Sequence, residues 1–527
     1  MQTRQTRSER RLAARVAAKD GTPEKPGPIP PLGLPLIAIL VFAAFCVLPQ
    51  VNSQPALLAS FGFTAAVLAI FLFFLRANVR RTGRVLSYQF LAVRVHYVQL
   101  VMHSCIFAYW GLYWDEVYRH IPLILAQVAF VYALDMMVCW SRRDKWMLGF
   151  GPFPIVFSTN LFLWFHDDWF WLQFLMIATF VLCKEFVRWN RDGRRVHIFN
   201  PSGIALFLFS IGLLVAHATN ISWGAEIAGT MQRPPQIYIE IFVLGLIVQS
   251  LFSVTLVTLS AAFVMYVFGT AFTHATGEYY FIDSNIHAAV FLGMHLLVTD
   301  PSTSPRRMTG KIIFGGLYGA AVIALYAVLQ KYHAPQFYDK LLCVPILNLM
   351  VRGLDHGSDA FSTRFHPLNL LKRWGPRKLN FLHMAIWTAL FGVMLSTGFL
   401  GRGNSEFQVE CENNNAASCL AYGKTMISGQ GGEAVSKVRG GEAIGRACNL
   451  GLAEGCQALS GFIRNGGLDV FKNSCSEGET VACFLSGWVQ TKGLGVTRNE
   501  SAAIPFYEKA CSRGFGPACE ALNQIKR

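Results

Sequence analysis

The chain has 527 residues, of which 53% are hydrophobic and only 15% are charged, and its formal net charge is +15. Because soluble domains usually contain about 25% charged residues, this composition excludes an ordinary soluble protein. Apolar runs long enough to cross about 30 Å of hydrocarbon as helices recur through residues 31–400 and stop before residues 405–527. We therefore predict an all-α fold in two parts, a polytopic membrane domain and a soluble tail.

Basic residues mark one side of the predicted membrane domain. Residues 1–30 form a basic segment, and most later Lys and Arg residues fall in loops on the same side. The loops on the other side contain only Arg119, Arg233, Lys331 and Lys340. This distribution follows the positive-inside rule. It predicts a cytoplasmic N-terminus and a lipid bilayer as the partner of the apolar surface, and no nucleic-acid partner is expected.

The apolar runs between residues 31 and 400 predict about thirteen spans, an odd number that places the C-terminus outside. This count requires Ile237–Phe272 to be a tight hairpin of two spans rather than one long helix. The runs Gly151–Phe165 and Leu341–Val351 are short, and the count falls if they are re-entrant segments.

Two polar sequences interrupt the apolar pattern on the predicted inner side. In "RRVHIFNPSG", Asn200 can cap a helix that begins at Pro201, and Ser202 can serve the unpaired N–H groups of its first turn. In "LLVTDPSTSPRRMTGK", Asp300 and the proline after it end a span and begin a basic loop. Taken alone, each sequence reads as a helix boundary.

Taken together, these sequences resemble the NqrB/RnfD family, the membrane subunits of redox-driven sodium or proton pumps. "KEFVRWNRDGRRVHIFNPSG" resembles the helix entry of that family, and "LLVTDPSTSPRR" resembles its later inner loop. Divergent stand-alone members, some of them associated with enediyne biosynthesis, are more similar still. The resemblance covers about residues 90–352 and implies a bacterial inner-membrane protein.

The family resemblance also implies a flavin, FMN or riboflavin, and other subunits of a redox complex. On that basis the candidate cofactor-binding residues are Asn200, Ser202, Asp300 and Thr230. Family members with covalent FMN attach it to the Thr of a Ser-Gly-Ala-Thr motif. Here the corresponding loop, "HATNISWGAEIAGTMQRPP", has no such motif, and Thr230 is only the nearest hydroxyl. This departure puts the redox function in doubt.

Ionisable residues inside predicted spans are candidates for function, because burying charge in hydrocarbon is costly. His287 and His295 lie about two turns apart on one run, and His103 lies on another. Paired His residues can ligate haem, but hydrogen bonding between helices is commoner and we do not expect haem. Glu240 and Asp135 are candidate proton-relay groups, with snorkelling toward the interface as the alternative. The sequence predicts no catalytic residue and no metal site.

Residues 405–527 contain four cysteine pairs with the same C-x7-C spacing. The spacing pairs Cys411 with Cys419, Cys448 with Cys456, Cys475 with Cys483, and Cys511 with Cys519. Each pair spans a helix end, a short turn and the start of the next helix, which brings two cysteines within disulfide reach. Zinc sites usually use shorter spacings. An even number of cysteines in a segment predicted to lie outside favours four disulfides.

The last of these segments, "LSGWVQTKGLGVTRNESAAIPFYEKACSRGFGPACEAL", resembles the Sel-one-like repeat, a relative of the tetratricopeptide repeats. The resemblance covers residues 405–527 and implies an α-solenoid that binds a protein partner. The alternative is a disulfide-stapled cap without a ligand. The other cysteines lie in apolar runs, where a free Cys usually behaves as a small buried hydrophobe.

Three functions are compatible with these features. The first is an electron-transport or ion-translocating membrane subunit, which would make the chain an electron-transfer or non-catalytic part of an oxidoreductase. The second is a non-redox protein on the same scaffold, for small-molecule transport or resistance. The third is a membrane-anchored scaffold that presents the repeats, for which so many spans are excessive.

Overall fold

The computed structural model describes residues 30–191, 193–232, 234, 236–276, 280–281, 284–332, 334–364, 375–397, 399–400, 404–428, 437–477, 479–513 and 515–526. Nearly all of the predicted basic segment 1–30 lies outside these residues. The described residues are predominantly helical, as predicted, and their buried apolar side chains form two separate cores. One core runs from Ile39 to Leu400, and the other runs from Cys411 to Ala518.

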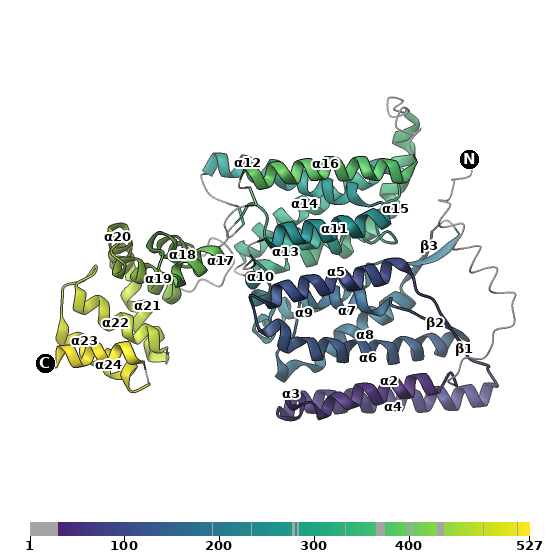
Figure 1. Ribbon diagram of the computed structural model, residues 1–527, viewed down its shortest axis with the longest axis horizontal. Helices are drawn as coiled ribbons and strands as arrows, with labels where there is room; N and C mark the ends of the chain where they lie inside the picture. The colour runs from purple at the N-terminus through teal and green to yellow at the C-terminus, as the bar shows by residue number, and fades with distance from the viewer. Residues whose placement is uncertain are drawn as a thin grey trace.

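The first part of the chain is a bundle of helices that lie roughly along one direction (Figure 1). Its first helices are α2 Gly33–Ala44, α3 Pro49–Asn52, α4 Pro55–Thr82, α5 Arg94–Gly111, α6 Glu116–Arg142, α7 Pro152–Asn160, α8 Trp171–Phe186 and α9 Pro201–Val215. Its later helices are α10 Gly224–Thr230, α11 Ile237–Phe252, α12 Thr255–Thr276, α13 Ala288–Leu296, α14 Met308–Lys331, α15 Asp339–Arg364 and α16 Pro376–Ser396.

Two small sheets lie at one end of this bundle, which we call the strand end. Strand β1 (Ser87–Phe90) pairs in parallel with β2 (Lys145–Leu148), and β3 (Arg188–Arg191) pairs antiparallel with β4 (Arg194–His197). The short helix α10 and the start of the repeats lie at the opposite end, which we call the repeat end (Figure 1).

The bundle contains two five-helix units of similar design, α5–α9 and α11–α15. In each unit the third helix, α7 or α13, has only 9 residues. The packing also corresponds: α5 contacts α7 as α11 contacts α13, and α6 contacts α8 as α12 contacts α14. The units meet through equivalent helices, because α5 packs against α11 and α9 packs against α15. This is the pairing that a two-fold axis between the units would produce.

The two units run in opposite directions. Helix α5 follows β1 and so begins at the strand end, whereas α11 follows α10 and begins at the repeat end (Figure 1). Each later helix of the second unit is reversed relative to its counterpart in the same way. The short helices α7 and α13 therefore enter the bundle from opposite ends, which is the arrangement called an inverted repeat.

The structure does not support the predicted count of about thirteen spans. By length and composition, 5 described helices could cross a membrane, namely α4, α6, α12, α14 and α16. Shorter apolar helices cover Gly33–Val47, Pro201–Val215 and Ile237–Phe252. The physical reason is that several predicted runs break early, since α7 and α13 end after 9 residues and α8 after 16. The hairpin within Ile237–Phe272 is confirmed, because Ser253 turns the chain with φ of 56° between α11 and α12.

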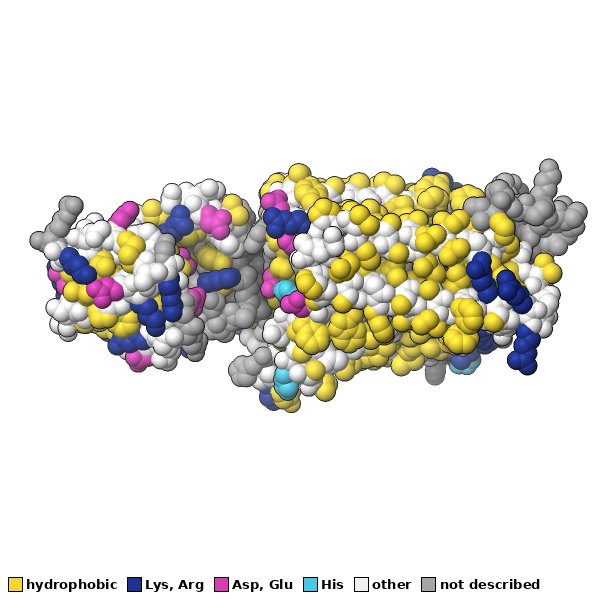
Figure 2. Space-filling view, turned by 90° about the horizontal axis from the view of Figure 1, so that it is seen from below, with side chains coloured by type: hydrophobic (Ala, Val, Ile, Leu, Met, Phe, Trp, Pro, Cys, Tyr) yellow, Lys and Arg dark blue, Asp and Glu magenta, His cyan; other side chains and the backbone are white. Residues whose placement is uncertain are grey.

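The outer surface of the bundle is apolar over a wide band. On α4, Phe63, Phe73 and Phe74 are 70%, 67% and 63% exposed. Figure 2 shows hydrophobic side chains across this face and Lys and Arg side chains gathered toward the strand end. Such a surface is stable in hydrocarbon rather than in water.

The second part of the chain is a series of helical hairpins. Its helices are α17 Asn404–Glu412, α18 Ala416–Ser428, α19 Lys437–Asn449, α20 Ala453–Phe462, α21 Leu468–Glu477, α22 Thr480–Lys492, α23 Glu500–Cys511 and α24 Gly516–Ile525. Consecutive helices pack against each other. This arrangement is the one expected for stacked helical repeats.

Disulfides staple these hairpins, and the four predicted disulfides are confirmed. Each joins the end of one helix to the start of the next, with a Cα–Cα distance between 4.4 and 4.8 Å. The bonds join Cys411 to Cys419, Cys448 to Cys456, Cys475 to Cys483, and Cys511 to Cys519. The first and third bonds are buried in the core of the repeats, whereas the second and fourth are half-buried.

Candidate functional site

The two polar sequences that carry the family resemblance lie against each other at the strand end. The Arg191 side chain, only 6% exposed, donates hydrogen bonds to the backbone carbonyls of Ser302 and Ser304, each at 3.0 Å. It also forms a 2.6 Å ion pair with Asp355 on α15. Asp355 accepts a further hydrogen bond from the Arg306 backbone N–H at 2.9 Å. One buried guanidinium therefore ties β3 to the 297–307 segment and to α15.

Asn200 also connects the 297–307 segment and α15, through hydrogen bonds of its side chain and backbone. Its side-chain oxygen accepts hydrogen bonds from the Gly203 N–H (3.1 Å) and the Ser202 hydroxyl (2.8 Å), as a helix cap. Its side-chain nitrogen donates to the Leu297 carbonyl at 3.0 Å, and its backbone N–H donates to Asn348 on α15 at 3.0 Å. Each hydrogen-bonding group of this side chain therefore has a partner within the protein.

Asp300 binds three neighbours at the start of the 297–307 segment. His197 on β4 lies 3.1 Å away, and the Ser302 N–H and Thr303 hydroxyl donate to the carboxylate at 2.9 and 3.2 Å. Burial alone would raise the pKa of Asp300, but the His197 contact and these hydrogen bonds outweigh it and lower the pKa below its ordinary value. Three of the four candidate cofactor residues, Asn200, Ser202 and Asp300, thus belong to one polar cluster.

The fourth candidate, Thr230, lies elsewhere, at the end of α10 near the repeat end. It is 4% exposed. Its hydroxyl donates to the Glu226 carbonyl at 2.7 Å and accepts from the Trp110 ring N–H at 3.2 Å. A phosphoester on this oxygen would break both contacts in a packed site. The residues present therefore do not fit a flavin attached at Thr230, and we derive no chemical step through a flavin.

The ionisable residues singled out in the sequence are distributed over several elements. His287 precedes α13 and accepts a hydrogen bond from the Ala289 N–H, while His295 lies near the other end of that helix. His103 is buried in α5. Glu240 lies in the first turn of α11. No group of three or more His, Cys, Asp or Glu side chains suited to a metal ion occurs among the described residues.

Asp135 lies on α6 toward the strand end. Its carboxylate accepts a hydrogen bond from the Trp146 ring N–H at 2.9 Å and lies 3.7 Å from the Lys184 ammonium group. The contacts connect α6 to β2 and α8. A proton-relay role for Asp135 stays a prediction.

Sequence reasoning missed a buried cluster of uncharged polar residues where α7 ends. Asn160, the last residue of α7, exchanges hydrogen bonds with Gln127 on α6 at 2.7 and 3.2 Å. Gln173 on α8 donates to both, at 3.1 and 3.3 Å, and His120 on α6 lies 3.3 Å from Asn160. All four side chains are at most 4% exposed. The available signal was the presence of Gln and Asn inside apolar runs.

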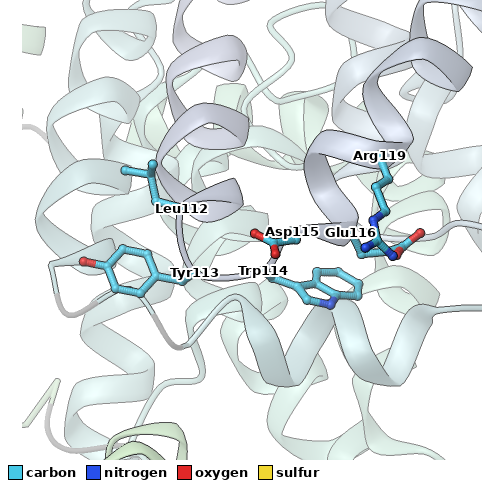
Figure 3. A pocket seen from close by; sticks show the side chains of 6 residues that line it. All are labelled: Leu112, Tyr113, Trp114, Asp115, Glu116 and Arg119. Atoms are coloured by element: carbon cyan, nitrogen blue, oxygen red, sulfur yellow. The ribbon is translucent and has the colours of Figure 1, made fainter.

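An aromatic layer separates this amide cluster from the repeat end. Trp164 stacks on His120 with ring centroids 4.1 Å apart and on Trp114 at 5.3 Å, and Trp110 packs beside them. Trp114 of this layer also lines an open pocket of about 400 Å³ at the α5–α6 turn. Figure 3 shows the Glu116 and Arg119 side chains pointing toward one another in this pocket and Tyr113 pointing away from them.

The second unit also has buried polar residues beside its short helix. Gln249 on α11 donates to the Thr258 hydroxyl on α12 at 2.9 Å, and that hydroxyl donates to the Met294 carbonyl of α13 at 2.9 Å. Asn380 on α16 donates to the Gln249 carbonyl at 3.3 Å. Both units therefore place uncharged polar side chains beside the helix that stops within the bundle.

Comparison with known proteins gives little further guidance. No protein-family model matches the chain, and no curated protein matches it. One solved structure that matches is a protective antigen present in uropathogenic Escherichia coli strains, displaying an SLR fold. It is 14% identical, the match covers 76% of this chain and 79% of that chain, and the TM-score is 0.13. So poor a superposition carries no conclusion about this chain, and its repeat character rests on the stapled hairpins themselves.

Proposed function

We propose that this chain moves an ion or a small polar solute across the bacterial inner membrane. The observation that carries the proposal is the pair of oppositely directed units, each with a 9-residue helix beside buried uncharged polar residues. Transporters are often built from inverted repeats whose broken helices place the substrate site near the middle of the bilayer. Backbone that leaves a helix at that depth is tolerated only inside protein or beside a water-filled cavity.

In this proposal the strand end is cytoplasmic and the repeat end faces outward. The chain then makes about thirteen passes, because α7 and α13 each complete a crossing with the non-helical segment that follows. The basic loops at the strand end support this orientation. The four disulfides support an exported repeat domain, since disulfides persist outside the cytoplasm. Stacked helical hairpins present an extended surface, so we assign the repeats to a protein partner.

The test is flux through the purified full-length chain in liposomes. Formamide entry is followed by stopped-flow light scattering, and Na⁺, K⁺ and H⁺ entry are followed with ion-sensitive dyes. We expect at least one probe to cross faster than in protein-free liposomes of the same lipid. If none of the four does so with correctly oriented, folded protein, the proposal is wrong.

A second candidate is an electron-transport subunit of a redox-driven pump. The observation that favours it is the contact between the two sequences that resemble NqrB/RnfD, made by Arg191 with the carbonyls of Ser302 and Ser304. This candidate requires a chromophore, and flavin absorbs visible light. Protein purified under mild conditions that is colourless and does not take up added FMN or riboflavin would exclude it.

A further inference from the structure

The second unit and the neighbouring helix α16 contain buried polar atoms that have no partner among the described residues. Four of these atoms lie on α11, α12, α13 and α16, namely Gln249 Oε1, Thr255 Oγ1, His295 Nε2 and Trp387 Nε1. The four side chains are 0% exposed. An unpaired buried polar group costs free energy, and in a membrane the surrounding lipid offers no substitute partner. We call these four residues the polar column.

Part of the polar column, His295 and Trp387, lies where α11, α13 and α16 meet. Gly245 on α11 lets His295 approach so closely that a Cβ at position 245 would lie 2.2 Å from the His295 ring. The centroid of the Trp387 ring lies 6.0 Å from that of His295. The two unpaired ring nitrogens therefore belong to neighbouring rings.

The other two residues of the column, Gln249 and Thr255, lie closer to the strand end. Gln249 is one turn beyond Gly245 on α11, and its amide nitrogen is held by the Thr258 hydroxyl at 2.9 Å. Thr255 lies one turn before Thr258 on α12, at the start of the helix, and its N–H donates to Asn380 at 3.3 Å. The column thus follows α11 and α12 from the end of α13 to the strand end of the bundle.

The unpaired atoms of the column include both hydrogen-bond donors and acceptors, and none of them is charged. His295 Nδ1 lies 2.8 Å from the Phe291 carbonyl, which can only accept, so Nδ1 carries the proton and Nε2 presents a lone pair. Gln249 Oε1 is a second acceptor. Trp387 Nε1 is a donor, and the Thr255 hydroxyl can act in either role. An occupant must therefore both donate and accept hydrogen bonds.

Charge argues against an ion. On α11, α12, α13 and α16 the charged residues are Glu240, Arg377 and Lys378, and the last two are exposed at the start of α16. Glu240 is five residues from Gly245, which places it about 140° around α11 from the column. Lys311 lies at the strand end, where its ammonium donates to the Ser253 carbonyl at 2.8 Å, and it disfavours entering cations. The unpaired acceptors disfavour anions.

The first unit provides an internal contrast. Beside α7, Gln127, Asn160 and Gln173 satisfy one another, and the Trp164 ring N–H donates to the Asn160 carbonyl. That cluster needs no further molecule. The polar residues beside α13 include unpaired donors and acceptors, so these two polar clusters differ in whether they require an occupant.

We propose that the polar column binds water and neutral hydrogen-bonding molecules little larger than water, and that such neutral solutes are what the protein moves. The second half of this statement rests on the proposed transport function, whereas the first half does not. Water in a polar buried site typically makes about three hydrogen bonds, and the column provides four unpaired atoms.

Hydration of the column can be tested without any transport. Radiolytic hydroxyl-radical labelling of the full chain in H₂¹⁸O marks side chains beside buried water. We expect ¹⁸O on Trp387 of the column and on Met294, which directly precedes His295 on α13. The matched controls are Trp110 and Trp140, which are equally buried but whose ring N–H groups are bonded to Thr230 and Ser87. Labelling of Trp387 no greater than that of Trp140 would overturn the proposal.

The solute class is tested with Trp387→Phe, which removes the N–H and keeps the ring, and with Trp110→Phe as the control. One hydrogen bond to the solute corresponds to about a 5-fold effect, so we expect formamide flux to fall about 5-fold in W387F and to be unchanged in W110F. Ion flux without formamide flux would leave the transport function standing and overturn the neutral class. If nothing crosses, the transport function fails, and the labelling still decides whether the column is hydrated.

Discussion

Replacing Arg191 with Ala should destabilise the membrane domain more than the loss of any surface charge. The Arg191 guanidinium is buried and makes three contacts, to the Ser302 and Ser304 carbonyls at 3.0 Å and to Asp355 at 2.6 Å. Removing one partner of a buried charge pair costs about 3–5 kcal/mol. Here the Ser302 and Ser304 carbonyls also lose their donor, while Asp355, which is 22% exposed, keeps only the Arg306 N–H bond among the contacts described above. For a large domain each kcal/mol lowers the Tm by roughly 2 °C, so the Tm should fall by about 6–10 °C.

The assay is thermal unfolding of the purified protein in detergent at pH 7. Arg84→Ala is the matched control, because Arg84 also pairs with an Asp near the strand end, at 2.7 Å, but its partner Asp144 has a side chain that is 61% exposed. An exposed pair is worth about 0–1 kcal/mol, so R84A should change the Tm by at most about 2 °C. Equal Tm values for R191A and R84A would refute the view that Arg191 holds β3, the 297–307 segment and α15 together.

Three further outcomes follow from the same structure. The disulfide between Cys448 and Cys456 closes a loop of about eight residues, so replacing both cysteines with Ser should destabilise the repeat domain by about 2.5 kcal/mol. Calorimetry measures this loss, and reductant should then have no further effect at that hairpin. Asp300 has a lowered pKa in the folded protein, so its stabilisation is present above the ordinary Asp pKa of about 3.9 and is lost as pH falls through the folded value. Asp300→Asn should therefore lower the Tm at pH 7 and flatten its decline below about pH 4, and an unchanged decline would contradict the assignment. Gly315→Ala would place a Cβ 2.1 Å from the Val257 carbonyl oxygen and should lower the Tm, whereas Gly62→Ala, with nothing within 4 Å, should not.

The sequence predicted what depends on local chemistry. The helix start at Asn200 follows from Asn-Pro-Ser-Gly, and the structure has that cap with the Gly203 N–H as donor. The four disulfides follow from constant spacing across a turn, and all four are present, from the Cys411 to Cys419 bond through to the Cys511 to Cys519 bond. Such features are decided within about ten residues of chain, so composition and spacing are sufficient to find them.

The span count and the polar clusters depend on long-range packing and could not be predicted in the same way. The run Gly151–Phe165 is apolar except for Ser158, Thr159 and Asn160, and the structure shows that its helix stops at Asn160, packed against α5 and α6. The criterion of ionisable residues inside spans does not select Gln127 and Gln173, because their amide side chains carry no charge. Their importance appears only when α6, α7 and α8 bring the amides within hydrogen-bonding distance.

The polar sequences that resemble those of a family need not be the place where a ligand binds. Asn200 uses its side-chain oxygen twice and its side-chain nitrogen on the Leu297 carbonyl, and Asn348 extends the same network to the Thr303 carbonyl at 3.0 Å. A ligand at Asn200 would have to displace contacts that hold α9 to the 297–307 segment. His295 Nε2 and Trp387 Nε1 in the same bundle have no partner, so a hydrogen bond to either atom would displace no existing contact. Binding in this fold is therefore expected where the packing leaves donors and acceptors unsatisfied, beside α13, while the Asn-Pro and Asp-Pro sequences hold the two units together.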